Sequence, residues 1–529
     1  SEDHIAPMDA ARRFEENRAV SLLPLEEVGR ITPRPLSADF SEEQGRIGCN
    51  TQLRHAPGLE NEAAFLRALL AGLAPAAEGE IVLDTGPVEL ETPAAGEAYL
   101  LEIETGRVRL RGASGHGVFN GLQTLRQLLD PEGRLPLGRV GDAPRFAYRG
   151  MMLDVARHFA DVETVLRLLD CMALYKLNRF HFHLTDDEGW RLPITALPEL
   201  TEVGARRGVP GDGSSCLPPS FGSGAAVDAS AGSGHYSHAD FIRILRYAQA
   251  RHIEVIPEFN MPGHARAAVL AMRVRHDRLL AAGDAAGADA FRLDDPNDTS
   301  VYESVQLWHD NVICIARPSC DRFVDTVVGE VAALYREAGV LLRAVHLGGD
   351  EVPAGAWLGS PICRARMAQQ GWHTVHELRA DFTARCRAIL ARHCLGFAGW
   401  DENALAASAD GGVVADPRFA GPGFQVYAWN NATGSSQEDC AWRLANAGYE
   451  VVLANAAHLY FDLAHAKDPQ EPGYYWAGFV DTRSVFGFRP LDLDPLSGAD
   501  QMGRPLSAQA AARLVGLSAP ERILGLQGQ

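Results

Sequence analysis

Positive charge and long apolar runs are both scarce in this sequence. Lysine and arginine together number 49 against 68 aspartates and glutamates, so the formal net charge is −19. Such a charge argues against nucleic acid or an anionic membrane as a partner and favours a neutral ligand. No apolar run approaches the roughly 18 residues that a membrane-spanning helix needs, so we expect no membrane span.

The cysteines offer no recognisable metal site. They number nine, are widely scattered and show no Cys-x-x-Cys spacing, so a structural zinc site is not expected. Cys314 and Cys320 lie in one expected loop and could be bridged in an oxidising compartment. The other cysteines, such as Cys171 and Cys386 on helical patterns, are expected to be buried thiols.

The length of 529 residues and the 46% apolar composition indicate one large globular domain and a smaller one. Residues 1–143 form the smaller unit, which combines short strand-like runs with helical patterns. The strand-like runs are 81–83, 98–103 and 107–111, and the helical patterns are 62–71 and 118–129. This combination predicts a small α+β domain.

Residues 144–529 alternate strand-like and helical patterns. The strand-like runs are 150–155, 179–184, 254–259, 343–347, 396–400, 424–429, 450–454 and 523–527, and the helical patterns are 162–176, 239–251, 322–338, 375–393 and 440–447. Eight strands that alternate with helices predict an α/β fold, a (β/α)8 TIM barrel, in which the loops after the strands build the site. Long insertions at 191–237 and 265–320 are expected to form lids or subsite walls.

The segment His346-Leu-Gly-Gly-Asp-Glu351 places two acids where a buried strand opens into a loop. The glycines allow a sharp turn and a close approach to a ligand. Two carboxylates in one pocket favour a state in which one stays ionised and the other is protonated, as acid/base catalysis requires. The alternative is a solvated turn, since Gly-Gly-Asp is ordinary turn chemistry.

Polar and aromatic residues also end the other strands. Arg157 follows the first strand, either as an ion-pair anchor for Asp154 or as a ligand-binding group. Trp400 and Trp429 end the fifth and sixth strands. Each alone is typical of a core aromatic, but two tryptophans beside acids indicate walls on which a sugar ring stacks.

The pair His181-x-His183 supports a different hypothesis. Metal-dependent barrel amidohydrolases hold a divalent cation with such a pair, and His264, His346 and Asp350 could complete the ligand set. Against this hypothesis, the pair lies on the second strand rather than the first. A third hypothesis is a non-catalytic sugar-binding protein, which would keep the tryptophans and not need Glu351.

Four long motifs in order resemble the family 20 glycoside hydrolases, which are β-N-acetylhexosaminidases, and the likeness is greatest to bacterial chitobiases. They are Arg149-Gly-Met-Met-Leu-Asp-Val-Ala-Arg-His158, Lys176-Leu-Asn-Arg-Phe-His-Phe-His-Leu-Thr-Asp-Asp-Glu-Gly-Trp-Arg191, Glu254-Val-Ile-Pro-Glu-Phe-Asn-Met-Pro-Gly-His264 and the segment that ends in Glu351. The resemblance is strong over 144–529, the expected catalytic domain, and looser over the preceding accessory domain.

The resemblance implies a retaining, substrate-assisted hydrolysis of terminal β-linked N-acetylglucosamine or N-acetylgalactosamine, as in chitobiose and chito-oligosaccharides. Family 20 is an exception to the two-carboxylate scheme of glycosidases. Glu351 matches the general acid/base, and Asp350 matches the residue that orients the 2-acetamido group, whose own oxygen is the nucleophile. No metal or organic cofactor is implied.

Further residues match the family by motif. Tyr460 resembles the tyrosine that hydrogen-bonds the acetamido oxygen, and Arg157 resembles the arginine that holds two ring hydroxyls. Trp400, Trp429 and Trp476 resemble the aromatic walls of the sugar site, Asp186 and His264 resemble residues that support Glu351, and Asp462 matches the family's aspartate two residues past the tyrosine. The implied ligand is a small, neutral oligosaccharide that ends in N-acetylhexosamine.

The sequence departs from the family pattern at its last residues. The family's eighth strand leads into a Trp-x-Glu element, whereas this sequence stops at Gly525-Leu-Gln-Gly-Gln529. We therefore expect that the C-terminal part of the barrel is missing, and that further residues or a separate chain or fragment complete it. From the family alone, a periplasmic or secreted location is expected.

Overall fold

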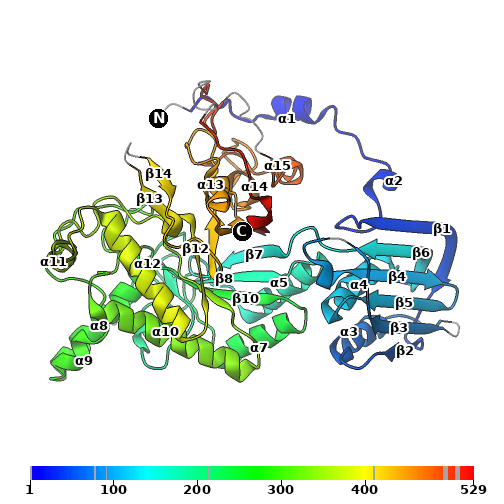
Figure 1. The fold of residues 1–529 in the computed structure, drawn as a ribbon, viewed down its shortest axis with the longest axis horizontal. Coiled ribbons are helices and arrows are strands. Elements are labelled where there is room, and N and C mark those ends of the chain that lie inside the picture. Colours follow the sequence, from blue (N-terminus) through cyan, green and yellow to red (C-terminus); the bar gives the residue numbers. More distant parts are fainter. Residues whose placement is uncertain are drawn as a thin grey trace.

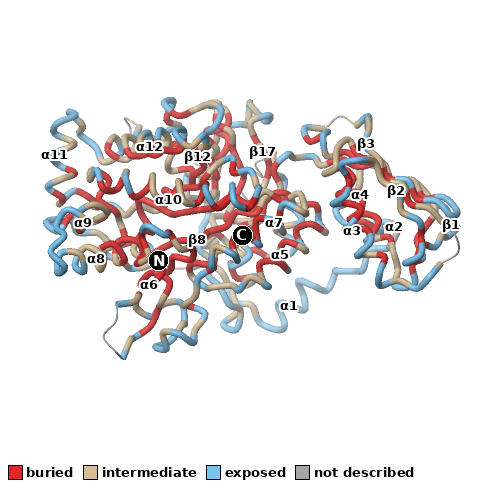
Figure 2. Tube along the Cα trace, turned by 90° about the horizontal axis from the view of Figure 1, so that it is seen from below, coloured by how far each residue is buried: buried red, intermediate tan, exposed pale blue. Residues whose placement is uncertain are grey.

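The protein consists of a six-stranded sheet with two covering helices, followed by a closed barrel (Figure 1). The computed structural model describes residues 3–76, 79–90, 92–211, 215–408, 412–492, 499–506 and 513–529. Buried apolar residues form one cluster in the first unit, and a large cluster with two smaller ones in the second (Figure 2). In the described part, no helix is both long and apolar enough to cross a bilayer.

The first unit is an open mixed sheet in the order β1-β6-β4-β5-β3-β2. The strands are β1 (Ser37–Arg46), β2 (Gln52–His55), β3 (Glu80–Thr85), β4 (Tyr99–Glu104), β5 (Arg107–Gly112) and β6 (Arg134–Asp142), with a short helix η1 (Ala95–Glu97) before β4. Helices α3 (Glu60–Leu70) and α4 (Gly115–Leu128) share one apolar core with this sheet. Helix α4 begins where the Ser114 hydroxyl accepts a hydrogen bond from the amide of Gly117. The predicted α+β domain is confirmed.

The second unit is a barrel of eight parallel strands that closes because β10 pairs with both β8 and β11. The strands are β7 (Tyr148–Asp154), β8 (Arg179–Asp186), β10 (Glu254–Phe259), β11 (Ala344–His346), β12 (Gly396–Trp400), β15 (Phe424–Ala428), β16 (Glu450–Leu453) and β17 (Ile523–Gly528). Strands such as β16 read as nearly continuous apolar runs because both faces are covered. The predicted (β/α)8 barrel is confirmed.

The helices between the strands cover the outside of the barrel. They are α5 (Val162–Leu174), α7 (His238–Gln249), α10 (Pro318–Ala338), α12 (Val375–Arg392) and α13 (Cys440–Asn446), whereas the short α14 (Ala456–Leu459) packs in a separate small cluster. Local chemistry fixes their ends: Ser237 and Thr374 form capping boxes at α7 and α12. Gly339 ends α10 with a φ of 71°, a conformation that favours glycine.

The insertions contain regular structure of their own. The segment 265–320, expected as a long loop, includes α8 (Arg266–Ala281) and α9 (Ala285–Asp289). The remaining elements are α1 (Ala10–Asn17), α2 (Leu25–Val28), β9 (Gly189–Trp190), α6 (Glu199–Glu202), α11 (Pro361–Gln370), η2 (Asp401–Ala404), β13 (Leu405–Ala407), β14 (Val413–Ala415), α15 (Thr482–Gly487) and η3 (Pro520–Arg522).

Buried ion pairs join the two units. The Lys176 ammonium donates to the Tyr99 hydroxyl at 3.0 Å and to the Asp142 carboxylate at 3.1 Å. Arg149 donates to Glu97 at 2.5 Å. Because these groups are largely shielded from water, each charge depends on its partner across the boundary. The units are therefore held in one orientation.

The first described residues lie against the barrel rather than against the sheet. Asp3 pairs with Lys467 at 2.5 Å and Arg13 with Asp468 at 3.0 Å. Asn17, at the end of α1, accepts a hydrogen bond from Arg483 at 2.9 Å. Figure 1 shows α1 close to α15, on the way to the sheet. The range 1–143 predicted for the first domain thus includes a segment that packs elsewhere.

The cysteines differ in part from expectation. All nine are thiols; Cys386 is buried as predicted, whereas Cys171 is exposed. Cys320 directs its sulfur at the carbonyl oxygen of Cys314, 3.1 Å away, and the sulfur of Cys314 lies 3.7 Å from that of Cys363. The bridge between Cys314 and Cys320 that the sequence allows in an oxidising compartment is not formed, because the second thiol points at the backbone of the first.

Candidate active site

The loop after β11 carries the two neighbouring acids. Gly348 and Gly349 have φ values of 65° and 97°, and Glu351 itself has a φ of 49°. A Cβ atom on Gly348 would overlap the amide of Asn260, and one on Gly349 would overlap the amide of Asn403. Only glycine fits both positions, and the resulting turn places the acids at the carboxyl end of the barrel.

The two acids have different surroundings. Asn260 donates from its amide to Asp350 at 3.1 Å. Burial, followed by the charges of Glu402 and Glu351, raises the pKa of Asp350 to about 7, although His264 opposes this shift. Glu351 keeps a quarter of its side chain exposed, and its carboxylate lies 3.3 Å from Nε2 of His264. The pKa of Asp350 thus responds to its buried surroundings, while Glu351 is the more exposed acid of the pair.

His264 connects these acids to Asp186. Its Nδ1 lies 3.1 Å from the Asp186 carboxylate, and its Nε2 also lies 3.5 Å from Asp350. Burial alone would lower the pKa of His264, but the Asp186 and Asp350 carboxylates raise it well above its ordinary value. The imidazole is therefore a cation that faces Glu351. The structure brings both predicted supporting residues, Asp186 and His264, to the acids.

Arg157 is held by three carboxylates. Its guanidinium contacts Asp154 at 2.8 Å, Asp186 at 3.0 Å and Glu188 at 3.0 Å. The ion pair with Asp154, one of the two interpretations of the sequence, is confirmed. Glu188 also accepts a hydrogen bond from the indole of Trp308 at 2.8 Å. With a fifth of its side chain exposed, Arg157 has a fixed direction and an accessible part.

Three aromatic rings form one cluster beside the acids. Trp476 meets Trp429 edge-on with centroids 5.7 Å apart and meets Tyr460 at 5.9 Å. Glu402 accepts a hydrogen bond from the indole of Trp429 at 3.2 Å. Trp400 lies deeper, 4% exposed, with its indole donating to Glu258 at 3.0 Å. Trp400 is thus a core aromatic, and it is also the last residue of β12.

Tyr460 and Asp462 follow β16 and α14 into the site. Burial and then the charges of Asp350 and Glu351 raise the pKa of the Tyr460 hydroxyl. Loss of solvation and then the Asp154 carboxylate raise the pKa of Asp462. The charges of the acid pair therefore act on Tyr460, and the charge of Asp154 acts on Asp462.

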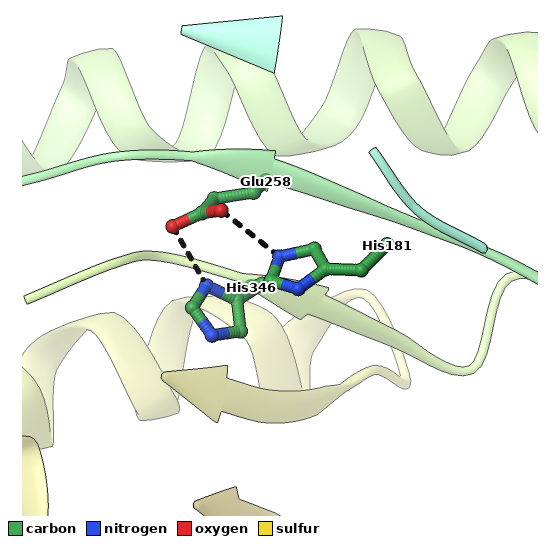
Figure 3. A group of neighbouring side chains, drawn as sticks. All are labelled: His181, Glu258 and His346. Atoms are coloured by element: carbon green, nitrogen blue, oxygen red, sulfur yellow. Dashed lines mark ion pairs between the residues drawn. The ribbon is translucent and has the colours of Figure 1, made fainter. Parts of the chain in front are cut away.

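The histidines predicted as metal ligands do not form one joint set: His181, His183 and His346 contact the Glu258 carboxylate, and His264 lies beside other acids. Within the described residues, His181 and His346 group with Glu258, whereas His264 groups with Asp350 and Glu351 (Figure 3 shows the first group). Both nitrogens of His183 are engaged, one by Glu258 at 2.5 Å and one by Asp186 at 2.8 Å. Neighbouring carboxylates raise the pKa of His183, so it is a cation and a poor metal ligand. The metal hypothesis built on this pair is therefore not supported.

Several residues of the site were given no role from the sequence. Glu258, Asn260 and Glu402 lie at or just after the ends of strands, where polar residues are expected to converge. Trp308 lies in the long insertion after β10, and nothing in its local sequence indicates that it contacts Glu188.

Comparison with known proteins places these features in a family. Residues 146–527 match the model described as "Glycosyl hydrolase family 20, catalytic domain", and residues 29–143 match "Glycosyl hydrolase family 20, domain 2". A beta-hexosaminidase of Vibrio vulnificus is 35% identical over 536 residues, which cover 99% of this chain and 61% of the relative. An N,N'-diacetylchitobiase of Vibrio harveyi is 39% identical over 430 residues, which cover 75% of this chain and 48% of the relative.

Solved structures agree with this placement. The chain is similar to a GH20 exo beta-N-acetylglucosaminidase from Vibrio harveyi in complex with N-acetylglucosamine, with a TM-score of 0.75, 30% identity and coverage of 94% of this chain and 69% of that one. A Streptomyces plicatus N-acetyl-beta-hexosaminidase has a TM-score of 0.65 and 27% identity, and the match covers 94% of this chain and 84% of that one. This chain spans about half to three fifths of the two Vibrio sequences. It belongs to glycoside hydrolase family 20.

Proposed function

We propose that this protein removes terminal, non-reducing β-linked N-acetylglucosamine or N-acetylgalactosamine from neutral oligosaccharides such as chitobiose. The observation that carries the proposal is the Asp350–Glu351 pair, which is fixed on one loop by His264 and Asn260. The aromatic cluster of Trp429, Tyr460 and Trp476 beside this pair suits a sugar ring.

The reaction proceeds in two steps with retention at the anomeric carbon. Glu351 gives its proton to the glycosidic oxygen while the carbonyl oxygen of the 2-acetamido group attacks C1, so the C1–O bond to the leaving group breaks and an oxazolinium ion forms. Asp350 accepts a hydrogen bond from the acetamido N–H and balances the positive charge. Glu351, now a carboxylate, takes a proton from a water molecule that attacks C1 and opens the ring.

The remaining residues orient the sugar. The Tyr460 hydroxyl donates to the acetamido oxygen, while Trp400, Trp429 and Trp476 enclose the acetamido methyl and the ring. Arg157 binds the ring hydroxyls, and the charges of Arg157 and Asp154 act on Asp462. A guanidinium fixed by three carboxylates loses little freedom when it binds a hydroxyl. For the location of the enzyme we propose the periplasm or the exterior.

Hydrolysis of a chromogenic N-acetyl-β-glucosaminide tests the proposal. Glu351→Gln should lower kcat by at least about a hundredfold because the proton transfer is lost. Glu163→Gln, on an exposed acid of α5, is the matched control and should leave the rate unchanged. Product NMR should show the β-anomer first, and an N-acetylglucosamine thiazoline should inhibit competitively.

The outcomes separate the alternatives. Full activity of Glu351→Gln, or an α-anomer as first product, would refute the mechanism. Activity abolished by EDTA and restored by a divalent cation would favour the metal hypothesis. Tight sugar binding by the wild type without any turnover would identify a non-catalytic sugar-binding protein.

A further inference from the structure

We propose that Glu258 and His183, inside the barrel, are positioning residues that control the proton transfer by Glu351 through a continuous chain of carboxylates and imidazoles. The inference rests on the proposed function, because it assigns a reason for the arrangement behind the acid/base residue. Neither residue can touch a sugar, since both are buried below the loop that carries the acids.

The chain is continuous at hydrogen-bond distances. The Glu258 carboxylate lies 2.5 Å from Nδ1 of His183, whose Nε2 lies 2.8 Å from one oxygen of Asp186. The other oxygen of Asp186 lies 3.1 Å from Nδ1 of His264, and Nε2 of His264 lies 3.3 Å from Glu351. Each middle residue uses one atom for the contact before it and another for the contact after it. A change in charge at Glu258 can therefore act on Glu351 through these contacts.

The charges of the four buried members, Glu258, His183, Asp186 and His264, alternate in sign. Burial opposes ionisation at these four, yet nearby histidine charges lower the pKa of Glu258, and Arg157 and His264 lower that of Asp186. Carboxylates raise the pKa of His183 and that of His264. Four of the five groups are inaccessible to water, so each is stabilised mainly by its neighbours. Only Glu351, at the end, is partly exposed.

Glu258 is fixed by groups from several strands. Figure 3 shows it between His181 of β8, at 2.9 Å, and His346 of β11, at 3.1 Å. The indole of Trp400, from β12, donates to the same carboxylate at 3.0 Å. The chain of carboxylates and imidazoles therefore starts on a barrel strand, β10, rather than on a loop.

The function of this arrangement follows from its geometry. A cationic His183 fixes one oxygen of Asp186, which leaves the other oxygen directed at His264. His264 in turn keeps an N–H directed at Glu351 and stabilises the carboxylate that forms when Glu351 gives up its proton. Without the charge of Glu258, the proton on His183 is less stabilised, and Asp186 loses a cationic partner on one oxygen although Arg157 still holds the other. The proton transfer is then impaired more than the binding of the sugar.

A leaving-group comparison tests the inference. A poor leaving group, such as the sugar released from chitobiose, depends on full protonation, whereas 4-nitrophenolate depends on it much less. We expect Glu258→Gln and His183→Gln to lower kcat/KM on chitobiose by about a hundredfold and on the 4-nitrophenyl glycoside by about threefold. The basic limb of the pH profile on chitobiose should also shift. The control is His181→Gln, which is equally buried on β8 and contacts Glu258 but lies off the chain, so its losses should be equal on the two substrates.

The result separates this inference from the proposed function. If the wild type hydrolyses neither substrate, the proposed function fails. If the wild type is active and the folded variants lose equal factors on both substrates, the proposed function stands and the inference is overturned. Should Glu258→Gln fail to fold, His183→Gln decides, with unchanged thiazoline inhibition expected under the inference and weakened inhibition under a merely structural role.

Discussion

The stability of this protein should depend on the protonation of Glu188. This acid is 1% exposed, and burial with the nearby charges of Asp186 and Asp187 raises its pKa from 4.5 to about 7, although Arg157 opposes the shift. A folded state with the higher pKa binds the proton more tightly than the unfolded state. The contribution of Glu188 to the free energy of unfolding is therefore fully present below about pH 4.5. This contribution is lost as the pH rises from 4.5 through 7.

The magnitude follows from the pKa difference. Each pKa unit corresponds to about 1.36 kcal/mol, so the loss contributed by Glu188 between pH 4.5 and pH 8 is at most about 3 kcal/mol. Glu188→Gln imitates the protonated acid and keeps an acceptor for Trp308. It should match the wild type in stability at pH 5 and exceed it at pH 8.

Urea denaturation at pH 5, 6, 7 and 8 is the assay, with tryptophan fluorescence as the signal. The difference in unfolding free energy between variant and wild type should grow over this range and level off above pH 7. Glu163→Gln, at an exposed site, should show no such trend. A difference that is constant with pH, or that favours the wild type at pH 8, would refute the reasoning.

Three other substitutions have definite expectations. Gly348→Ala should lower kcat by about a hundredfold, because its Cβ would displace the Asn260 amide that holds Asp350. Its control is Gly339→Ala, at a position that also has a positive φ but where a Cβ would have no atom within 4 Å. This control should cost only about 1–2 kcal/mol of stability. Trp476→Ala should raise KM by about tenfold through the lost ring contact, and Tyr474→Ala, at a more exposed neighbouring ring, should not. Lys176→Met should lower the unfolding free energy by about 3 kcal/mol, since Asp142 loses its partner, and calorimetry would contradict this if the transition did not move.

The barrel strands could be predicted from sequence because their pattern is local. The runs 179–184, 254–259 and 450–454 correspond to β8, β10 and β16 with ends that differ by no more than two residues. Each run has apolar residues at alternate or successive positions, and polar residues or glycine follow the strands. The acids of the site were found for the same reason, since they follow such strands directly.

The partners of these residues could not be predicted, because the contacts join distant parts of the chain. Glu188 meets Trp308 across 120 residues, and Trp308 lies in an insertion whose sequence has no recognisable pattern. Cys314 is close in sequence to Cys320, but its sulfur lies nearest to that of Cys363 on α11. Only the closed barrel, with its loops gathered at one end, determines these pairs.

The His-x-His pair shows how one spacing can serve two opposite chemistries. Residues two apart on a strand point to the same side, so His181 and His183 both face the barrel interior and both reach a single point on the neighbouring strand. In a metal enzyme that point is a cation, which requires neutral imidazoles. Here it is the carboxylate of Glu258, which instead favours a protonated His183. The spacing alone therefore predicts that two imidazoles converge. What the pair does depends on the sign of the charge where they converge, and a residue 75 positions after His183 sets that sign.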